Sequence, residues 1–548
     1  MDRRSFLQFA TASRKAMPSK QSTLPTTTTL MPYTGEWTLE QAAFLLHRTT
    51  FGPTPAQIYQ AVENGLSATI GALFAPQPAV APPVYYNFSN DPNVALGETW
   101  IHTPPTLGIA GLQGSRRRSL TAWQIGKMLQ GGTSIKEKMV LFWHEHFPVA
   151  NINNAQFGYH YLDLLQRNCF GNFRTLVEEI TVSPAMLIYL NGNQNTRQAP
   201  NENYARELLE LFTVGRGDVA APGDYTNYTE DDVVAMARCL TGWVARTLED
   251  GTVAGVFVPN RHDTGVKQLS HRFDNAIITD AADLEYKVVI DHILQKAEVA
   301  MFISRQLHIW FVGTNIDPVV EANILAPMAQ LIIDNDYAIQ PALEALLGSE
   351  YFFDASHRGC MITHPLDYLL RIAGCFMATS EADLLGEYRF WDQIYRMATS
   401  QEMVIMDIPS VAGWKAFYQA PQFYDFWINS VTLTLRQETA SDLMNGIFTG
   451  GFRWELDLLG FIAQIPNNTD PNALIEGIAA LLFAAPMSSQ QLAFLKEILI
   501  PGLPDYEWTI EYSDYLSQPD DPDLRNAVQT KLEAMFSTIF KMPEFYLI

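Results

Sequence analysis

One segment of the chain combines the residue types of an acid/base or metal site with helical spacing. Residues 201–212 read Asn-Glu-Asn-Tyr-Ala-Arg-Glu-Leu-Leu-Glu-Leu-Phe, and at about 100° per residue the apolar and polar side chains fall on opposite faces. The polar face carries Glu202, Asn203, Arg206, Glu207 and Glu210. If water covers this face, the segment is an ordinary amphipathic helix. If protein covers it, carboxylates one turn apart can hold a metal ion or share a proton.

A second polar pattern lies in a segment that is apolar on all sides. Residues 139–147 read Met-Val-Leu-Phe-Trp-His-Glu-His-Phe, which predicts a buried helix whose polar side chains need partners. His144 and His146 resemble a chelating pair, but side chains two positions apart point ~160° away from each other on an α-helix. One histidine at a site and the other bonded within the core fits this geometry better. For either residue taken alone, a hydrogen-bonded core histidine is the more common role.

A third group of polar residues lies on a glycine-containing loop. Residues 261–267 read Arg-His-Asp-Thr-Gly-Val-Lys. His262, Asp263 and Lys267 are typical of a binding loop beside a hairpin. An Asx turn followed by a surface lysine explains the same residues equally well.

Together the three segments support the hypothesis of an enzyme that uses a divalent metal or acid/base chemistry. The metal ligands would come from His144, His146, Glu202, Glu207 and Glu210. Carboxylates and imidazole suit a divalent ion that polarises a substrate or activates water.

A metal-free version of the same hypothesis assigns other roles. Glu207 would act as general base and His262 as proton donor, with Asp263 beside it. Arg206 or Lys267 would bind an anion. The amides of Asn201 and Asn203 both donate and accept, which suits them to orient these neighbours.

The competing hypothesis is a non-catalytic scaffold. In that case the polar motifs lock helices together, and the acidic surface and the aromatic segment 414–427 dock another protein. Large aromatic residues dominate cores as well as interfaces, and a core role is the more common one for such a segment.

Composition narrows the classes of function. The 548 residues are 47% hydrophobic, enough for several packed subdomains, and the net charge of −23 disfavours nucleic acid and anionic membranes as partners. No apolar run approaches the ~20 residues that span a bilayer. The four cysteines make no CxxC pair, which disfavours a structural zinc site. Phosphate-binding loops and the motifs of serine hydrolases and zinc proteases are absent.

Helical periodicity over most of the chain predicts a mainly α, multi-helical fold with one small β-hairpin near 244–258, turning at Asp250-Gly251. We expect a flexible N-terminal tail (1–35), a helical core with the polar motifs (36–380) and a C-terminal helical region packed on it (381–548). Beyond residue 110, helices are expected at 119–130, 135–147, 156–167, 172–180, 201–214, 229–242, 281–312, 318–334, 338–348, 365–378, 428–446, 453–464, 472–484, 488–499 and 522–540.

The start of the chain resembles a twin-arginine export motif at residues 2–8. A working signal also needs an apolar stretch of ~7–15 residues behind it, and charged and polar residues stand there instead. A periplasmic or cell-envelope location is expected if the motif works, and a cytoplasmic one otherwise.

Several motifs, in order along residues 37–548, resemble those of the bacterial domain-of-unknown-function family 1800 (DUF1800). They are residues 44–48, 142–147, 200–215, 228–233, 240–243, 262–267, 364–368, 411–414 and 543–545. The resemblance implies no defined activity, because the family's biochemistry is undefined. It implies a cell-envelope setting and a partner from a second exported family (DUF1501) that resembles sulfatases and alkaline phosphatases. The missing apolar stretch departs from the family's usual export signal.

Overall fold

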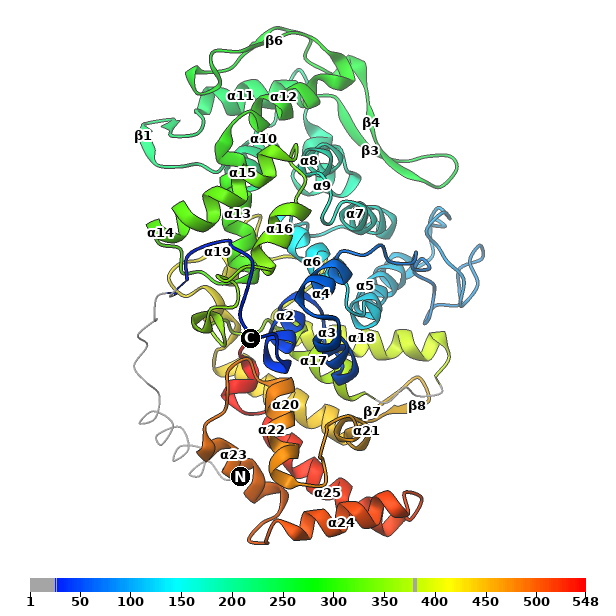
Figure 1. The fold of residues 1–548 in the computed structure, drawn as a ribbon. Coiled ribbons are helices and arrows are strands. Elements are labelled where there is room, and N and C mark those ends of the chain that lie inside the picture. The colour runs from blue at the N-terminus through cyan, green and yellow to red at the C-terminus, as the bar shows by residue number, and fades with distance from the viewer. Residues whose placement is uncertain (1–24, 26, 378–381) are drawn as a thin grey trace.

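The structure is a computed structural model that describes residues 25, 27–377 and 382–548. Helices make up most of it (Figure 1), and the strands of these residues form separate two-stranded antiparallel hairpins. The predicted mainly α fold is therefore confirmed. Residues 2–8, with the twin-arginine-like motif, lie outside the described residues. Within the described ranges, no helix is both long enough and apolar enough to cross a bilayer.

The helices fall into three consecutive groups along the chain. The first comprises α2 (Leu39–Thr49), α3 (Pro55–Asn64), α4 (Leu66–Leu73), α5 (Leu112–Gln130), α6 (Lys136–His146), α7 (Ala155–Arg167), α8 (Phe173–Thr181) and α9 (Pro184–Tyr189). The second comprises α10 (Asn203–Glu207), α11 (Glu230–Cys239), α12 (Glu285–Leu294), α13 (Ala297–Phe311), α14 (Pro318–Val320), α15 (Ala326–Asp334) and α16 (Gln340–Leu347). The third comprises α17 (Pro365–Phe376), α18 (Leu384–Ser400), α19 (Lys415–Tyr418), α20 (Ser430–Asn445), α21 (Leu458–Ala463), α22 (Pro471–Leu482), α23 (Ser489–Leu499), α24 (Tyr506–Ser517) and α25 (Pro522–Ile539). In Figure 1, α22 to α25 lie at one end of the molecule and α11 and α12 at the other.

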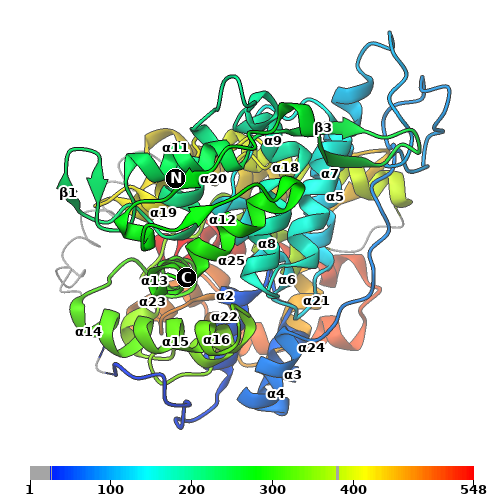
Figure 2. The ribbon, with the colours of Figure 1, turned by 90° about the horizontal axis from the view of Figure 1, so that it is seen from above.

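The predicted hairpin is present as β3 (Trp243–Thr247) and β4 (Val253–Phe257), with Trp243 opposite Phe257. It packs on α9 and α7 at the edge of the molecule (Figure 2). Gly251 in its turn has φ +81°, and a β-carbon there would lie 2.0 Å from the carbonyl oxygen of His102, so the turn requires glycine.

Three shorter hairpins were not expected from the sequence. They are β1 (Val219–Ala221) with β2 (Asp224–Tyr225), β5 (Lys267–Gln268) with β6 (Ile277–Ile278), and β7 (Ile447–Thr449) with β8 (Phe452–Trp454). Strands of two or three residues are too short to give an alternating pattern.

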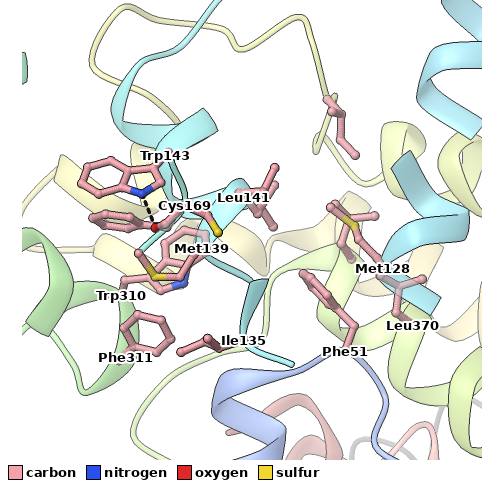
Figure 3. Close-up of a cluster of buried hydrophobic side chains, with 14 of the residues drawn as sticks. Phe51, Met128, Ile135, Met139, Leu141, Trp143, Cys169, Trp310, Phe311 and Leu370 are labelled. Atoms are coloured by element: carbon pink, nitrogen blue, oxygen red, sulfur yellow. Dashed lines mark hydrogen bonds between the residues drawn. The ribbon is translucent and has the colours of Figure 1, made fainter. Parts of the chain in front are cut away.

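Helix α6 lies in the centre of the apolar core. Its residues from Glu137 to His146 are all buried, as the all-round apolar pattern predicts. Figure 3 shows Trp143 and Met139 of this helix among apolar side chains that include Trp310 and Phe311 of α13. The indole Nε1 of Trp143 donates to the carbonyl oxygen of Cys169 at 2.6 Å. Each large side chain buried in this way stabilises the fold by about 1.5–3 kcal/mol.

Two helices, α18 and α24, were not anticipated from the sequence. Both are rich in aromatic residues, which favour strands over helices. Tertiary packing decides the outcome for α18, which lies along α5 with Trp391 over Gly126, where any β-carbon would come within 2.6 Å of the ring.

Residues 27–35 lie against the loop that follows α16, although the sequence groups them with the tail. The amide of Tyr33 donates to the carbonyl of Gly348 at 2.8 Å, and the amide of Glu350 donates to the carbonyl of Met31 at 2.9 Å. The hydroxyl of Thr34 donates to the Glu350 carboxylate at 2.6 Å. This part of the chain is therefore held by backbone pairing.

Candidate functional site

The polar segment 201–212 folds as one α-helical turn followed by a π-helical turn. The Asn201 side chain accepts from the amide of Asn203 at 2.9 Å and so starts α10. The π-turn Leu208–Thr213 follows at once, and the hydroxyl of Thr213 donates back to the carbonyl of Leu208. Such turns are rare and occur often at functional sites.

Arg206 on this segment is engaged in an ion-pair network at the protein surface. Its guanidinium donates to both carboxylate oxygens of Glu230, at 2.7 and 2.8 Å, and to Glu202 at 3.3 Å. All three side chains are partly exposed, so the network adds little stability. The charge of Arg206 is already matched by these carboxylates. Asn203 beside them is exposed.

Glu207 and Glu210 lie close together, as their spacing predicts. Burial raises the pKa of Glu207, the negative charge of Glu210 raises it further, and Arg206 opposes the shift. Glu210 in turn accepts from the hydroxyl of Tyr228 at 2.9 Å. This face of the segment is therefore half-buried rather than fully solvated.

His144 has both ring nitrogens in hydrogen bonds within the core. Its Nε2 accepts from the amide of Met406 at 2.9 Å, and its Nδ1 lies 2.9 Å from the hydroxyl of Tyr161. That hydroxyl donates onward to the carbonyl of Phe147 at 2.6 Å. Because every donor meets an acceptor, this network fixes His144 as a neutral imidazole. Burial lowers its pKa to about 3.

The next residues of α6 are bonded to two other segments. Glu145 accepts from the amide of Trp414 at 2.9 and 3.1 Å, and burial raises its pKa well above the usual range. His146 Nε2 lies 2.9 Å from the carbonyl oxygen of Phe212, in the π-turn. His146 thus touches the polar segment 201–212 through its backbone, not through its carboxylates.

The loop that carries His262 builds a second and more highly charged centre. His262 is buried, and its Nδ1 lies 2.9 Å from the carbonyl and 3.1 Å from the hydroxyl oxygen of Thr241. The Thr241 hydroxyl donates its own proton to the carbonyl of Arg238 at 2.7 Å. Both partners of Nδ1 are therefore acceptors, so Nδ1 carries a proton.

The other ring nitrogen of His262 faces two carboxylates. Nε2 lies 3.2 Å from Glu285 and 3.8 Å from Asp280. The Glu285 side chain is fully buried, whereas that of Asp280 is 44% exposed. One ligand atom from each of these three residues lies within 4.8 Å of the others, and they form the only such group of three or more His, Cys, Asp and Glu side chains in the part of the chain that the structure describes.

Lys267 is the fourth charged residue of this centre. Its ammonium lies 2.5 Å from the second carboxylate oxygen of Glu285 and also donates to the carbonyl of Asp263. Cys239, the last residue of α11, borders the same carboxylate, and burial raises the pKa of its thiol. We refer to His262, Lys267, Asp280 and Glu285 as the His262 centre.

Asp263 turns away from this centre and pairs with Arg238. The guanidinium donates to its carboxylate at 2.7 and 3.2 Å, and this contact holds the pKa of Asp263 below its usual range. Arg238 lies eight positions after Glu230 on α11, which corresponds to about 12 Å along the helix axis. The Arg206–Glu230 network and the His262 centre therefore lie near opposite ends of α11.

The predicted site residues therefore fall into three clusters. His144 and His146 lie in the core, Arg206 with Glu202, Glu207 and Glu210 in the second, and His262, Asp263 and Lys267 in the third. In the described ranges, no three of the predicted metal ligands have ligand atoms within 4.8 Å of one another. These predicted ligands are His144, His146, Glu202, Glu207 and Glu210.

Sequence reasoning missed Asp280 and Glu285. Their place is set by the β5–β6 hairpin, where Lys267 pairs with Ile278 and so brings the following residues beside the loop. Glu285, the first residue of α12, looks like an ordinary acidic residue of a first helical turn. Only the hairpin register reveals its partner.

Fold and site together define a mainly helical protein with a buried His/Lys/carboxylate centre on a short hairpin loop. The chain belongs to the family described as Protein of unknown function (DUF1800), whose model matches residues 44–547. No curated protein and no solved structure matches it.

Proposed function

We propose that this protein is a metal-dependent enzyme whose divalent metal ion is bound by His262, Asp280 and Glu285. The observation that carries the proposal is the orientation of His262. With the proton on Nδ1, the lone pair of Nε2 points at two carboxylates, all of them acceptors. Such an arrangement is repulsive unless a proton or a metal ion lies between them.

The spacing of the ligand atoms supports a metal ion. Tetrahedral sites with ligands ~2.0–2.2 Å from the ion place the ligand atoms about 3.3–3.6 Å apart. Nε2 of His262 lies 3.2 and 3.8 Å from the two carboxylates. The Thr241 carbonyl that accepts from Nδ1 would orient the imidazole, as outer hydrogen bonds do in metal sites generally.

Charge supports the same conclusion. Asp280 and Glu285 contribute two negative charges and Lys267 one positive charge. The centre therefore has a negative charge in excess when His262 is neutral, and a cation would relieve it. One imidazole and two carboxylates suit zinc, manganese or ferrous iron.

Three protein ligands leave coordination positions open, which is the mark of a catalytic rather than a structural ion. Water bound there would lose a proton near neutral pH and become a nucleophile. Asp280 is the exposed member, so substrate would approach from its side. Lys267 would hold Glu285 in place and offset its charge.

The scaffold hypothesis uses the acidic surface and the aromatic segment 414–427 for docking, and the second of these must be accessible. Trp414, Phe417, Tyr424 and Trp427 are buried, and Tyr418 is the most exposed large aromatic residue there. That leaves little apolar surface for a partner such as a DUF1501 protein, so we favour the metal site. A cell-envelope location is part of the proposal only through the family resemblance.

Metal analysis and calorimetry with Zn²⁺ and Mn²⁺ test the proposal. The purified protein should bind one of these ions stoichiometrically, and Asp280→Asn should weaken binding at least ~10-fold, since it removes a charged ligand without disturbing the core. Asp283→Asn is the matched control, because Asp283 is an exposed acid three residues away. Absence of binding, or equal affinities of the two variants, would overturn the metal site.

A further inference from the structure

A polar cavity lies in the core, and none of the residues of the His262 centre lines it. It is lined by Arg48, Lys138, Thr363, His364 and Asp367 together with Trp310, Phe417, Tyr424 and Trp427. Residues 418–422, between two of these aromatic residues, are exposed. The cavity therefore lies directly beneath a surface segment.

Cations outnumber carboxylates around this cavity. Lys138 pairs with Asp367. Burial lowers the pKa of Lys138, Asp367 opposes this shift, and the positive charges of Arg48 and Arg371 add to it. Arg436 donates to the carbonyl of Thr363 at 2.6 Å. All four cations are buried. Among the carboxylate side chains of the described residues, Asp367 alone forms an ion pair with any of them.

The guanidinium groups are held mainly by main-chain oxygens, and the oxygen of Ile548, which also lines the cavity, belongs to the last residue of the given sequence. Arg48 donates to the carbonyls of Phe311 and His357 and to the oxygen of Ile548, at 2.7–2.9 Å. Arg371 donates to the carbonyl of Phe545. Burial lowers the pKa of Arg371 to about 10, as expected for a charge whose surroundings compensate it poorly.

His364, which also lines the cavity, is neutral and adds no positive charge to the four buried cations. Its Nδ1 accepts from the amide of Asp367 at 3.1 Å, so the proton sits on Nε2, 3.0 Å from the Asp367 carboxylate. Burial lowers the pKa of His364 to about 4, and the ring is neutral at pH 7. Asp367 is thus shared by Lys138 and His364 and has little capacity left for the guanidinium groups.

Several donors on the cavity wall, Arg48 Nε and Trp427 Nε1 among them, have no hydrogen-bond partner among the described residues. The indole Nε1 of Trp427 is buried and makes no hydrogen bond to any described residue. A buried N–H without an acceptor costs about 1–3 kcal/mol. Trp414 has the same unbonded indole N–H but does not line the cavity.

We infer that this cavity is a binding site for a small oxyanion, a carboxylate or a phosphate group. Such an anion would accept from Trp427 and balance the buried charges of Lys138 and the neighbouring guanidinium groups. The cavity is small, so it would take a single anionic group rather than an extended ligand. Its existence does not depend on the metal proposed at the His262 centre.

The buried cations around this cavity contrast with the acidic character of the whole protein. With a net charge of −23, the chain repels anions at long range. Four cations buried around a single carboxylate side chain are therefore a local exception. They come from α2, α6, α17 and α20, elements far apart in the sequence.

Titration with sodium phosphate and sodium acetate tests the inference. Both would be added at constant ionic strength, with gluconate, an anion too bulky for the cavity, as the balancing salt. Phosphate or acetate should raise Tm and give a saturable calorimetric signal, and the comparison of the two salts identifies the preferred group. Trp427→Phe should weaken binding about 3–10-fold, since it removes one N–H donor and keeps the aromatic wall.

Trp414→Phe is the matched control, because it removes an equivalent buried indole N–H outside the cavity. It should leave the affinity unchanged. Lys138→Gln, which removes a charge, should weaken binding by more than Trp427→Phe. If neither salt raises Tm above the gluconate reference, or if the two tryptophan variants bind equally, the inference fails.

Discussion

The histidines of α6 and the histidine of the 261–267 loop are all buried but have different surroundings. His144 has two neutral partners, and each hydrogen bond runs from a clear donor to a clear acceptor. His262 has one such partner and, on its other side, two carboxylates and a lysine. Burial alone therefore does not distinguish a structural histidine from a reactive one. The charge left unmatched around it does.

The largest effect on stability is expected when His144 is removed. His144→Ala would leave the Met406 amide without an acceptor, remove one of the two partners of the Tyr161 hydroxyl and open a cavity in the core. We expect a loss of about 3–5 kcal/mol in the free energy of unfolding, measured with urea. Zn²⁺ affinity of the folded variant should stay at the wild-type value.

His262→Ala should show the opposite pattern, with metal binding lost and a smaller loss of stability. It should cost less stability than His144→Ala, because the Lys267–Glu285 ion pair remains. If His144→Ala lost the metal while His262→Ala kept it, the assignment of the two histidines would have to be exchanged.

The buried histidines of α6 should also make the stability of the protein depend on pH. Burial lowers the pKa of His144 to about 3 and that of His146 to about 4, against 6.5 when unfolded. Their contribution is fully present above pH 6.5 and is lost as the pH falls from 6.5 toward those values. Each contributes up to ~1.4 kcal/mol per pH unit.

Urea unfolding at pH 6.5, 5.5 and 4.5 measures this slope. His144→Gln should lose stability less steeply than the wild type, by about 1 kcal/mol per pH unit. His271→Gln, a change at an exposed histidine, should keep the wild-type slope. A wild-type slope in His144→Gln would mean that this imidazole already takes up a proton when folded.

Periodicity and composition were enough to predict much of the fold. The all-round apolar pattern of residues 139–147 correctly indicated a buried helix, and Asp250-Gly251 correctly marked a hairpin. The spacing of Glu207 and Glu210 correctly placed them together, but it could not show the π-turn, in which the Phe212 carbonyl contacts His146.

The sites were harder to predict because their partners are distant in the chain. Lys138 and Asp367 are 229 positions apart, and no local pattern links them. Glu285 joins His262 only through a hairpin of two residues per strand. A single sequence records the residue types of a site but not the tertiary contacts that select among them.

The smallest effect is expected at Asp263, on the surface side of the loop. Asp263→Asn would remove a partly exposed ion pair with Arg238 and keep the loop's backbone contacts. It should lower the free energy of unfolding by about 0.5–1 kcal/mol at pH 7. Because the pKa of Asp263 is lowered in the fold, this difference should shrink as the pH falls below about 4. Arg167→Gln, at another partly exposed ion pair, is a suitable control for the size of the effect.

The π-turn Leu208–Thr213 gives the chain a length requirement at this point. A π-turn closes its hydrogen bond over one residue more than an α-turn. Deleting one residue there would let a regular helix run through, and the Phe212 carbonyl would keep nearly the direction in which it now faces His146. An insertion, in contrast, would rotate that carbonyl by about 100°, so the segment should tolerate changes of side chain and a one-residue deletion better than an insertion.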